Sequence, residues 1–329
     1  MGLFSREDKV DPNSESRDWQ LVASIAQESL KEQKKARRWG IFFKLFFCIY
    51  IVIILVGVAR QNSVSQYSVS QEHVGIIYLD GVISADEGAN ASDLVVALRA
   101  AFKNSSSKAV ILAINSPGGS PVQSGYVYDE IRRLRAIYTN KKIYAVISDL
   151  GASGGYYIAA AADEIYADKS SLVGSIGVTA ASFGFVELME KLGVERRSYT
   201  SGEHKSFLDP FAPQREDEKV FWENVLSTTH NQFIQAVETG RGDRLVKGDE
   251  DLYSGLIWSG EQALGLGLID GLGSAGYVAR EVINVEQVVD YTLRPTPFEE
   301  FSRNFGISVG EGVGAVLNAV ISKPIKLSY

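Results

Sequence analysis

The chain has 329 residues, with 40 acidic and 33 basic side chains and a formal net charge of −7. This length allows one large domain with appendages or two domains of average size. The acidic balance argues against a surface that neutralises phosphates, so a nucleic-acid partner is not expected. The single cysteine, Cys48, excludes an intrachain disulfide and a cysteine-based metal site.

Residues 39–59 form an apolar stretch, WGIFFKLFFCIYIVIILVGVA, in which Lys44 is the single charge. A helix of this length is about 30 Å long, which matches the hydrocarbon core of a bilayer, so we expect a transmembrane helix. Five basic side chains lie within residues 31–38. The positive-inside tendency therefore places the N-terminus in the cytoplasm and the chain after residue 60 on the other side. A cleaved secretion signal is the alternative, because the GVA segment at 57–59 has the small residues of a cleavage site.

Strands and helices are predicted to alternate after this stretch. Residues 1–38 form a polar, partly helical segment, and residues 60–72 form a Ser/Gln-rich linker. From His73 onward, the apolar runs HVGIIYLDGVI, KAVILAINSPGG and KKIYAVISDL are typical of buried strands. Segments 90–104 and 121–137 between them have the apolar spacing of helices. The pattern predicts an α/β fold with a largely parallel sheet.

Two further features follow in the C-terminal half of the chain. Residues 217–242 have apolar side chains at multiples of four positions and end on a glycine, which predicts a long amphipathic helix. Residues 296–329 form a C-terminal tail that ends in a Gly-rich, apolar stretch.

Ser153 is the candidate nucleophile, in the segment GASGG between the third strand and an alanine-rich helical run. A nucleophilic serine needs a base, oxyanion donors and a backbone conformation that exposes its hydroxyl. The flanking glycines permit a sharp strand-to-helix turn, and the amide of Gly154 at the helix start would face the oxyanion. The segment also fits the G-x-S-x-G pattern of α/β-hydrolases. A purely structural turn is the alternative.

The identity of the base decides the class of enzyme. The chain has three histidines, and none follows residue 230, which argues against the late histidine of a hydrolase triad; they are His73, His204 and His230. A lysine can act as base where a dry cleft favours its neutral amine. Lys205, in SGEHKSFLDPF, is followed by several apolar residues and is a candidate. An exposed loop lysine is the alternative.

Five sequence blocks resemble the signal peptide peptidase A (protease IV) family of serine proteases. They occur in the order INSPGGS, ASGGYYIAAAADEIYAD, LVGSIGV, SGEHKSFLDPF and SGEQALGLGLIDGLG, and the resemblance covers about residues 73–275. It implies a ClpP/crotonase-like spiral of strand-strand-helix units, which we assign to residues 73–295, and a Ser–Lys dyad in place of a triad.

The resemblance also assigns roles to individual positions. Ser153 matches the nucleophile, Lys205 the general base and Ser175 the hydroxyl that assists the lysine. Gly119 and Gly154 match the residues whose amides form the oxyanion hole, with Gly118 as the close second for the former. The alternative for Ser175 is a glycine-bounded strand entry without a catalytic role.

The expected function is a membrane-anchored serine endopeptidase that degrades cleaved signal peptides and other apolar peptides, without a metal or other cofactor. The resemblance implies a ring-like homo-oligomer whose groove is completed between neighbouring subunits. We expect a single-pass protein of the bacterial inner membrane, held in lipid by residues 39–59, with a cytoplasmic N-terminus and a periplasmic protease domain. Two alternatives stay open: an α/β-hydrolase-type esterase that uses Ser153 with a histidine, and a non-catalytic membrane scaffold of the same fold.

Overall fold

The computed structural model divides the chain into two units, Met1–Ser68 and Val69–Tyr329. The structure describes residues 28, 31–35, 37–53, 71–86, 88–248 and 250–294. The remainder of the predicted anchor, most of the linker and the C-terminal tail lie outside these residues.

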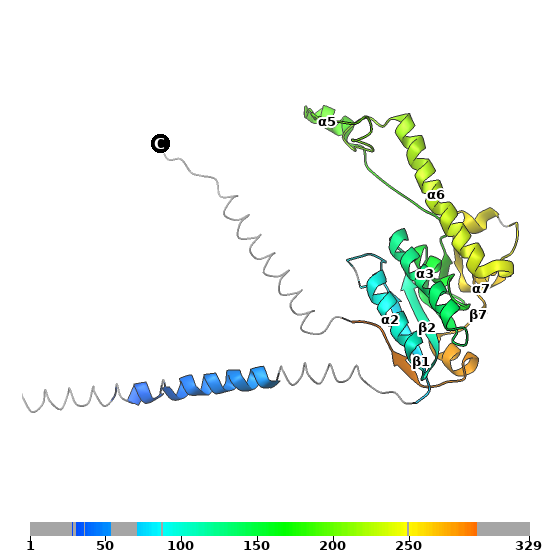
Figure 1. The fold of residues 1–329 in the computed structure, drawn as a ribbon. Coiled ribbons are helices and arrows are strands. Elements are labelled where there is room, and N and C mark those ends of the chain that lie inside the picture. The colour runs from blue at the N-terminus through cyan, green and yellow to red at the C-terminus, as the bar shows by residue number, and fades with distance from the viewer. Residues whose placement is uncertain are drawn as a thin grey trace, which may run out of the picture. The chain divides into compact units, whose positions relative to one another are not determined.

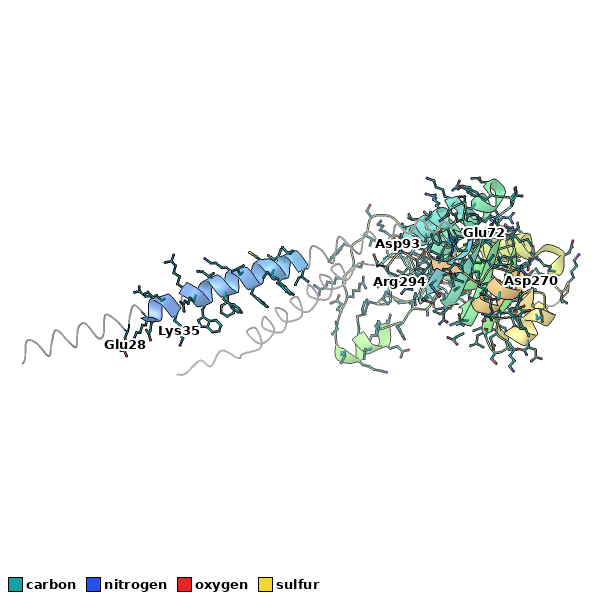
Figure 2. All side chains as sticks on the ribbon, turned by 90° about the horizontal axis from the view of Figure 1, so that it is seen from below. Glu28, Lys35, Glu72, Asp93, Asp270 and Arg294 are labelled. Carbon is teal, nitrogen blue, oxygen red and sulfur yellow. The ribbon has the colours of Figure 1, made fainter. Side chains whose placement is uncertain are left out.

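In the first unit, residues 31–35 and 37–53 are helical. Figure 2 shows the side chains of this region, with Glu28 and Lys35 toward its polar N-terminal end. Apolar side chains such as Phe47 and Ile53 are exposed on the helix. Within the described stretches of the chain, no helix is both long enough and apolar enough to cross a bilayer.

The second unit is built around a mixed sheet whose centre is parallel, as predicted (Figure 1). Its three central strands pair in parallel in the order β1-β2-β3 and are β1 (His73–Asp80), β2 (Ser107–Ser116) and β3 (Ile143–Ala152). These are the three strands that the apolar runs predict. Outside β1, the short strand β8 (Val288–Asp290) adds a further parallel pair.

On the side away from β2, strand β3 pairs with two different strands, so the sheet divides into two branches. Its first part, from Tyr144 to Ile147, pairs in parallel with β4 (Glu164–Ala167), and its last residues pair in parallel with β5 (Leu172–Gly174). Each branch continues by one more strand, β4 to the parallel β7 (Gly271–Leu272) and β5 to the antiparallel β6 (Ile257–Ser259). Ser153 therefore directly follows the part of β3 that pairs with β5.

Helices cover the sheet and connect its strands. The helices are α2 (Ala91–Lys103), α3 (Pro121–Ile137), α4 (Gly154–Ala159), α5 (Val186–Leu192), α6 (Glu216–Arg241), α7 (Gly260–Gly265) and α8 (Ala275–Tyr277), with short helical turns at Gly242–Arg244, Glu250–Tyr253 and Val278–Val282. The predicted helices at 90–104, 121–137 and 217–242 correspond to α2, α3 and α6. Asn90 and Ser120 cap the first two through side-chain oxygens that accept a backbone N–H of the first turn.

The core lies on both faces of the sheet, because alternate residues of each strand point in opposite directions. The larger cluster combines residues such as Leu112 and Ile147 of the sheet with Leu98 of α2. The smaller cluster, on the other face, includes Ile111 and Val278. Figure 1 shows α2 and α3 side by side on the sheet.

Helix α6 is attached to the core by its C-terminal half alone. Phe233 and Val237 are buried there, whereas Val220 and Phe221 of the N-terminal half are exposed. Gly240 permits the contact, since a Cβ at this position would lie 1.9 Å from the carbonyl oxygen of Ala160. The N-terminal half of α6 therefore extends beyond the core.

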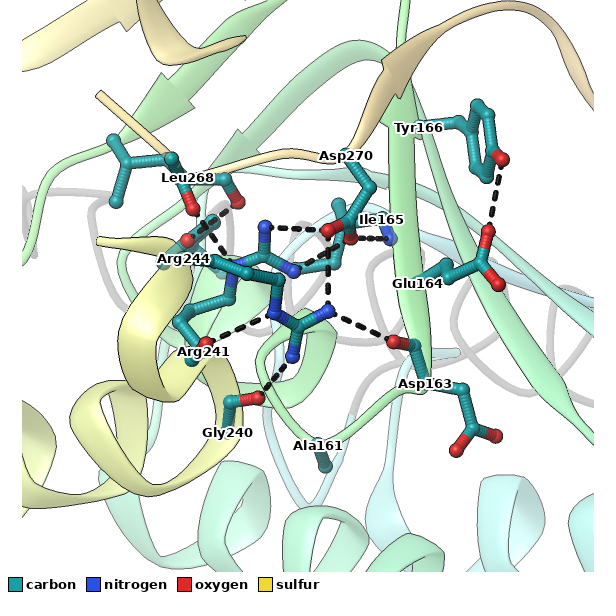
Figure 3. A network of polar contacts seen from close by, with 12 residues as sticks. Ala161, Asp163, Glu164, Ile165, Tyr166, Gly240, Arg241, Arg244, Leu268 and Asp270 are labelled. Carbon is teal, nitrogen blue, oxygen red and sulfur yellow. Dashed lines mark hydrogen bonds and ion pairs between the residues drawn. The ribbon is translucent and has the colours of Figure 1, made fainter. Parts of the chain in front are cut away.

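A buried ion-pair network fixes the C-terminal end of α6 (Figure 3). The guanidinium of Arg241, which is almost completely buried, donates to both carboxylate oxygens of Asp270 at 2.6 and 3.0 Å. Asp270 also accepts the backbone N–H of Ile165 at 2.7 Å and a bond from Arg244 at 3.1 Å. The network joins α6, β4 and the loop before β7.

Asp270→Ala is expected to lower the free energy of unfolding by about 3–5 kcal/mol, because it leaves a buried guanidinium without its partner. Burial acts to raise the pKa of Asp270, but hydrogen bonds and charge from Arg241, with the Ile165 amide and Arg244, outweigh it and lower the pKa. A carboxylate of this kind stabilises the fold above its unfolded-state pKa, and the contribution is lost as the pH falls through the folded-state value.

Urea unfolding at several pH values measures this effect. The difference between wild type and Asp270→Ala should be constant near neutral pH and should shrink below about pH 4. Asp243→Ala is the matched control, because this neighbouring carboxylate is fully exposed and pairs with an exposed Lys247. Equal losses of stability in the two variants would contradict the assignment.

Candidate active site

Ser153 occupies a strained turn between β3 and α4. Its backbone has φ 52° and ψ −123°, a region that residues with a Cβ rarely adopt. Its N–H donates to the carbonyl of Gly174 at 2.9 Å, which ties the turn to the end of β5. The turn places the side chain at the start of α4, where backbone amides are free of helical partners.

The amides of Gly119 and Gly154 lie side by side next to this serine. A Cβ at Gly154 would be 3.3 Å from the Gly119 nitrogen, and one at Gly118 would be 2.7 Å from the Cβ of Ser153. In the described part of the chain, neither the Gly119 nor the Gly154 amide donates a hydrogen bond. The Gly118 amide, in contrast, donates to the Ser116 hydroxyl at 3.1 Å. Two adjacent free N–H groups are what an oxyanion requires.

These residues line a cavity of about 540 Å³. Ser153, Ser175, Gly119 and Gly154 all belong to its wall. The other lining residues are Pro117, Pro121, Ser124, Tyr157, Gly177, Val178, Thr179, Thr229, Gln232, Phe233, Ser254 and Gly255. The cavity therefore brings together four of the five site residues that the sequence predicts.

Ser175 directly follows β5 and lines the cavity. Like Ser153 it is a non-glycine residue with a positive φ, 52°, and its N–H donates to the Leu256 carbonyl at 2.7 Å. Such a conformation is costly for a residue with a Cβ, so both serines are held in place by the surrounding backbone. A plain strand entry would not need this strain.

Lys205, the fifth predicted site residue, does not line the cavity. It is exposed and lies in the segment 180–215, which we call the arm. Figure 1 shows α5, which belongs to the arm, beyond the N-terminal end of α6. The arm packs on α6 through Phe207, whose ring lies 5.8 Å from that of Phe221. Within this one chain, the predicted base is not part of the cavity wall.

The cavity contains no other residue that could serve as base. Among its lining residues none is a lysine, histidine, aspartate or glutamate. His230 of α6 bonds instead through Nε2 to the Ile176 carbonyl at 3.1 Å, and His73 bonds to Tyr291 at 2.9 Å. His204 is exposed on the arm, 3.9 Å from Glu218. In the described part of one chain, the cavity thus holds Ser153 and two free amides but no side chain that could accept the serine proton.

Sequence reasoning missed the contribution of α6 to the cavity. Thr229, Gln232 and Phe233 form one wall, and the ring of Phe233 lies 5.0 Å from that of Tyr157 in α4. Two polar residues three positions apart on an otherwise amphipathic helix are the only local signal for this wall. Ser116, which precedes the predicted Pro-Gly-Gly turn, was also missed.

A half-buried serine on a strained turn at a cavity wall, beside two free amides, has the arrangement of acyl-transfer enzymes with a serine nucleophile. The sequence matches Peptidase family S49 over residues 135–288. A putative protease of Methanocaldococcus jannaschii, MJ0651, is 30% identical over 65% of this chain and 70% of its own length. A putative signal peptide peptidase SppA of Enterococcus faecium is 34% identical over 62% of this chain and 58% of its own length.

The chain belongs to Peptidase family S49, the family of the SppA-like proteases. A Brucella abortus protein named Na(+)/H(+) antiporter NhaA is 43% identical over 67% of this chain, but the match covers 30% of that protein. The chain thus spans about a third of the length of the first curated relatives that it matches. Most of the protein with the transporter name lies outside the match.

Proposed function

We propose that the protein is a membrane-anchored serine endopeptidase that degrades cleaved signal peptides and other apolar peptides with a Ser153–Lys205 dyad. The observation that carries this proposal is the composition of the cavity, which holds Ser153, Ser175 and the free amides but no base. A second copy of the chain completes the site by inserting Lys205 from its arm.

The arm has the surface of an interface. Every residue from 180 to 215 is at least partly exposed, and large apolar side chains there include Phe183, Leu192 and Tyr199. Contiguous exposed apolar groups of this kind favour a protein partner. The arm and the cavity are different surfaces of one chain, so a head-to-tail contact joins them. Repeated contacts of this kind form a ring when the rotation between copies closes, and we propose this ring for the protein.

The dyad reaction needs no metal or other cofactor. Ser153 Oγ attacks the substrate carbonyl and passes its proton to the neutral amine of Lys205, while Ser175 holds that amine in position. The amides of Gly119 and Gly154 stabilise the oxyanion, and the lysine returns its proton to the leaving amine. Water, activated by the same amine, then hydrolyses the acyl-enzyme. Docking of the arm excludes water from the cavity, which favours the neutral amine.

The sequence and a relative support peptides at a membrane as substrates. Residues 39–59 anchor the chain in the lipid of a bacterial inner membrane, with the N-terminus in the cytoplasm and the protease domain in the periplasm; the apolar stretch and the preceding basic residues support this. The printed name of the Enterococcus relative supports signal peptides as substrates. The forked sheet and its strand-helix units support a ClpP/crotonase-like spiral.

A serine-reactive fluorophosphonate probe on the purified full-length protein tests this function, followed by mass spectrometry of the labelled peptide and of products from a synthetic signal peptide. Labelling at Ser153 and peptide cleavage are expected, and both should disappear in Ser153→Ala. Labelling at another serine, or a folded oligomer that neither reacts with the probe nor cleaves the peptide, would contradict the proposal. The second of these results would favour the scaffold alternative.

A further inference from the structure

We propose that Ser116 is a positioning residue of this site, one that makes the Gly119 amide, and not the Gly118 amide, the oxyanion donor. The inference rests on the proposed serine peptidase function and adds a residue to it. Ser116 ends β2, is fully buried and does not line the cavity, so it acts through the loop that follows it.

The Ser116 hydroxyl bridges two backbone segments. It donates to the carbonyl of Gly81 at 2.6 Å and accepts the N–H of Gly118 at 3.1 Å. Both hydrogen-bonding functions of the hydroxyl are thus used, and the Gly118 amide is withdrawn from the cavity. An alanine at this position would leave the buried N–H of Gly118 without its partner and would remove the hydrogen bond to the Gly81 carbonyl.

The next two peptide units are fixed against Ile83. The Ile83 N–H donates to the Gly118 carbonyl at 2.9 Å, and the Ile83 carbonyl accepts the Ser120 N–H at 2.8 Å. In a planar trans peptide the C=O and N–H point in opposite directions. Since the Gly118 carbonyl points at Ile83, the N–H of Gly119 in the same peptide unit points away from it.

Among the residues that the structure describes, the Ser116 hydroxyl alone bonds the first of these three peptide units, which joins Pro117 to Gly118. Gly118 and Gly119 have φ +95° and +151°, and as glycines they can adopt many other backbone conformations. A Cβ at Gly119 would lie 2.2 Å from the Ile83 carbonyl oxygen, so position 119 has no room for a side chain that could hold the loop. Without the hydroxyl, the Gly118 amide is free to turn, and the Ile83 bond to the Gly118 carbonyl alone then has to hold the Gly119 amide toward the cavity.

The test compares full-length wild type with Ser116→Ala, Ser116→Cys and Ser107→Ala. Ser107 is the matched control, because it is a buried serine at the other end of β2, where its hydroxyl donates to the Ala109 carbonyl at 3.2 Å. Each protein is assayed for kcat and KM and for its affinity for a peptide aldehyde and the corresponding peptide alcohol. The aldehyde adds Ser153 Oγ at its carbonyl carbon, the carbonyl electron pair moves to oxygen, and the hydroxyl proton passes to the base. The alcohol forms no such adduct, so the ratio of the two affinities reports formation of the adduct, whose oxygen the oxyanion donors stabilise.

Ser116→Ala is expected to lower kcat by about 10- to 100-fold with KM changed by less than about threefold, and to lower the aldehyde-to-alcohol ratio by the same factor as kcat. Ser116→Cys, whose thiol is a weaker donor and acceptor, should be intermediate. Ser107→Ala should match wild type in both readouts. If Ser116→Ala does not fold, the ratio in Ser116→Cys decides, with a fall of at least about threefold expected.

An unchanged aldehyde-to-alcohol ratio in the Ser116 variants would overturn the inference. A merely structural role of Ser116 would lower the melting temperature but would weaken binding of the aldehyde and the alcohol equally. Failure of the proposed function gives a different result: wild type itself then shows no preference for the aldehyde and no cleavage. The two failures are therefore distinguishable in one set of measurements.

Discussion

Ser153→Ala is expected to lower kcat/KM for a synthetic signal peptide by at least about 10⁴-fold, the range found when a serine nucleophile is removed from an enzyme of this kind. In the proposed reaction this hydroxyl forms the acyl-enzyme. The cavity wall also contains Ser124, Ser175 and Ser254, but Ser153 combines a strained turn with a position beside both free amides. The Ser153 backbone bond to Gly174 does not involve the side chain, so the fold should persist.

Two controls accompany this variant. Ser170→Ala removes an exposed hydroxyl outside the cavity and should retain wild-type activity. Ser153→Gly should be as inactive as Ser153→Ala but at least as stable as wild type, because glycine accepts the positive φ without strain. Activity of either Ser153 variant within tenfold of wild type would exclude Ser153 as the nucleophile.

Lys205→Ala is expected to lower kcat/KM by about 10³- to 10⁴-fold, because the nucleophile then has no proton acceptor. Lys205→Arg should be equally inactive, since a guanidinium stays protonated and cannot act as a base. The measurement is steady-state cleavage of the same peptide by the full-length protein. Lys219→Ala on α6 is the control, because this exposed lysine pairs with Glu216 and lies outside the arm and the cavity. Retained cleavage by Lys205→Ala would remove the dyad from the account.

The sequence predicts the centre of the fold because the signals there are local. Strands β1, β2 and β3 are dense apolar runs, and α2 buries Leu94, Leu98 and their neighbours at the predicted spacing. The fork of β3 has no such signal, since β4 to β7 are two to four residues long and their pairing depends on contacts distant in the sequence. The network of Arg241 and Asp270 likewise joins segments that the sequence separates.

The candidate site likewise has a part that the sequence predicts and a part that it does not predict. Ser153 and the glycine amides follow from short motifs that contain their own turn chemistry, so their positions could be predicted. The wall formed by Thr229 and Gln232 could not, because it requires α6 to lie across the end of the sheet. The position of Lys205 relative to Ser153 is a different problem, because in one chain the arm carries it outside the cavity. In the proposed dyad its role depends on contacts between copies, which no pattern within one sequence specifies.

Complementation between two inactive variants tests the shared site most directly. Differently tagged Ser153→Ala and Lys205→Ala chains are co-expressed, purified through both tags and assayed for signal-peptide cleavage. If the base comes from a neighbouring copy, random mixing creates sites with both groups intact, and about a quarter of wild-type activity should return. Ser153→Ala mixed with the double variant Ser153→Ala/Lys205→Ala is the control and should stay inactive. Mixed oligomers that carry both tags yet remain as inactive as either variant alone would contradict a site shared between subunits.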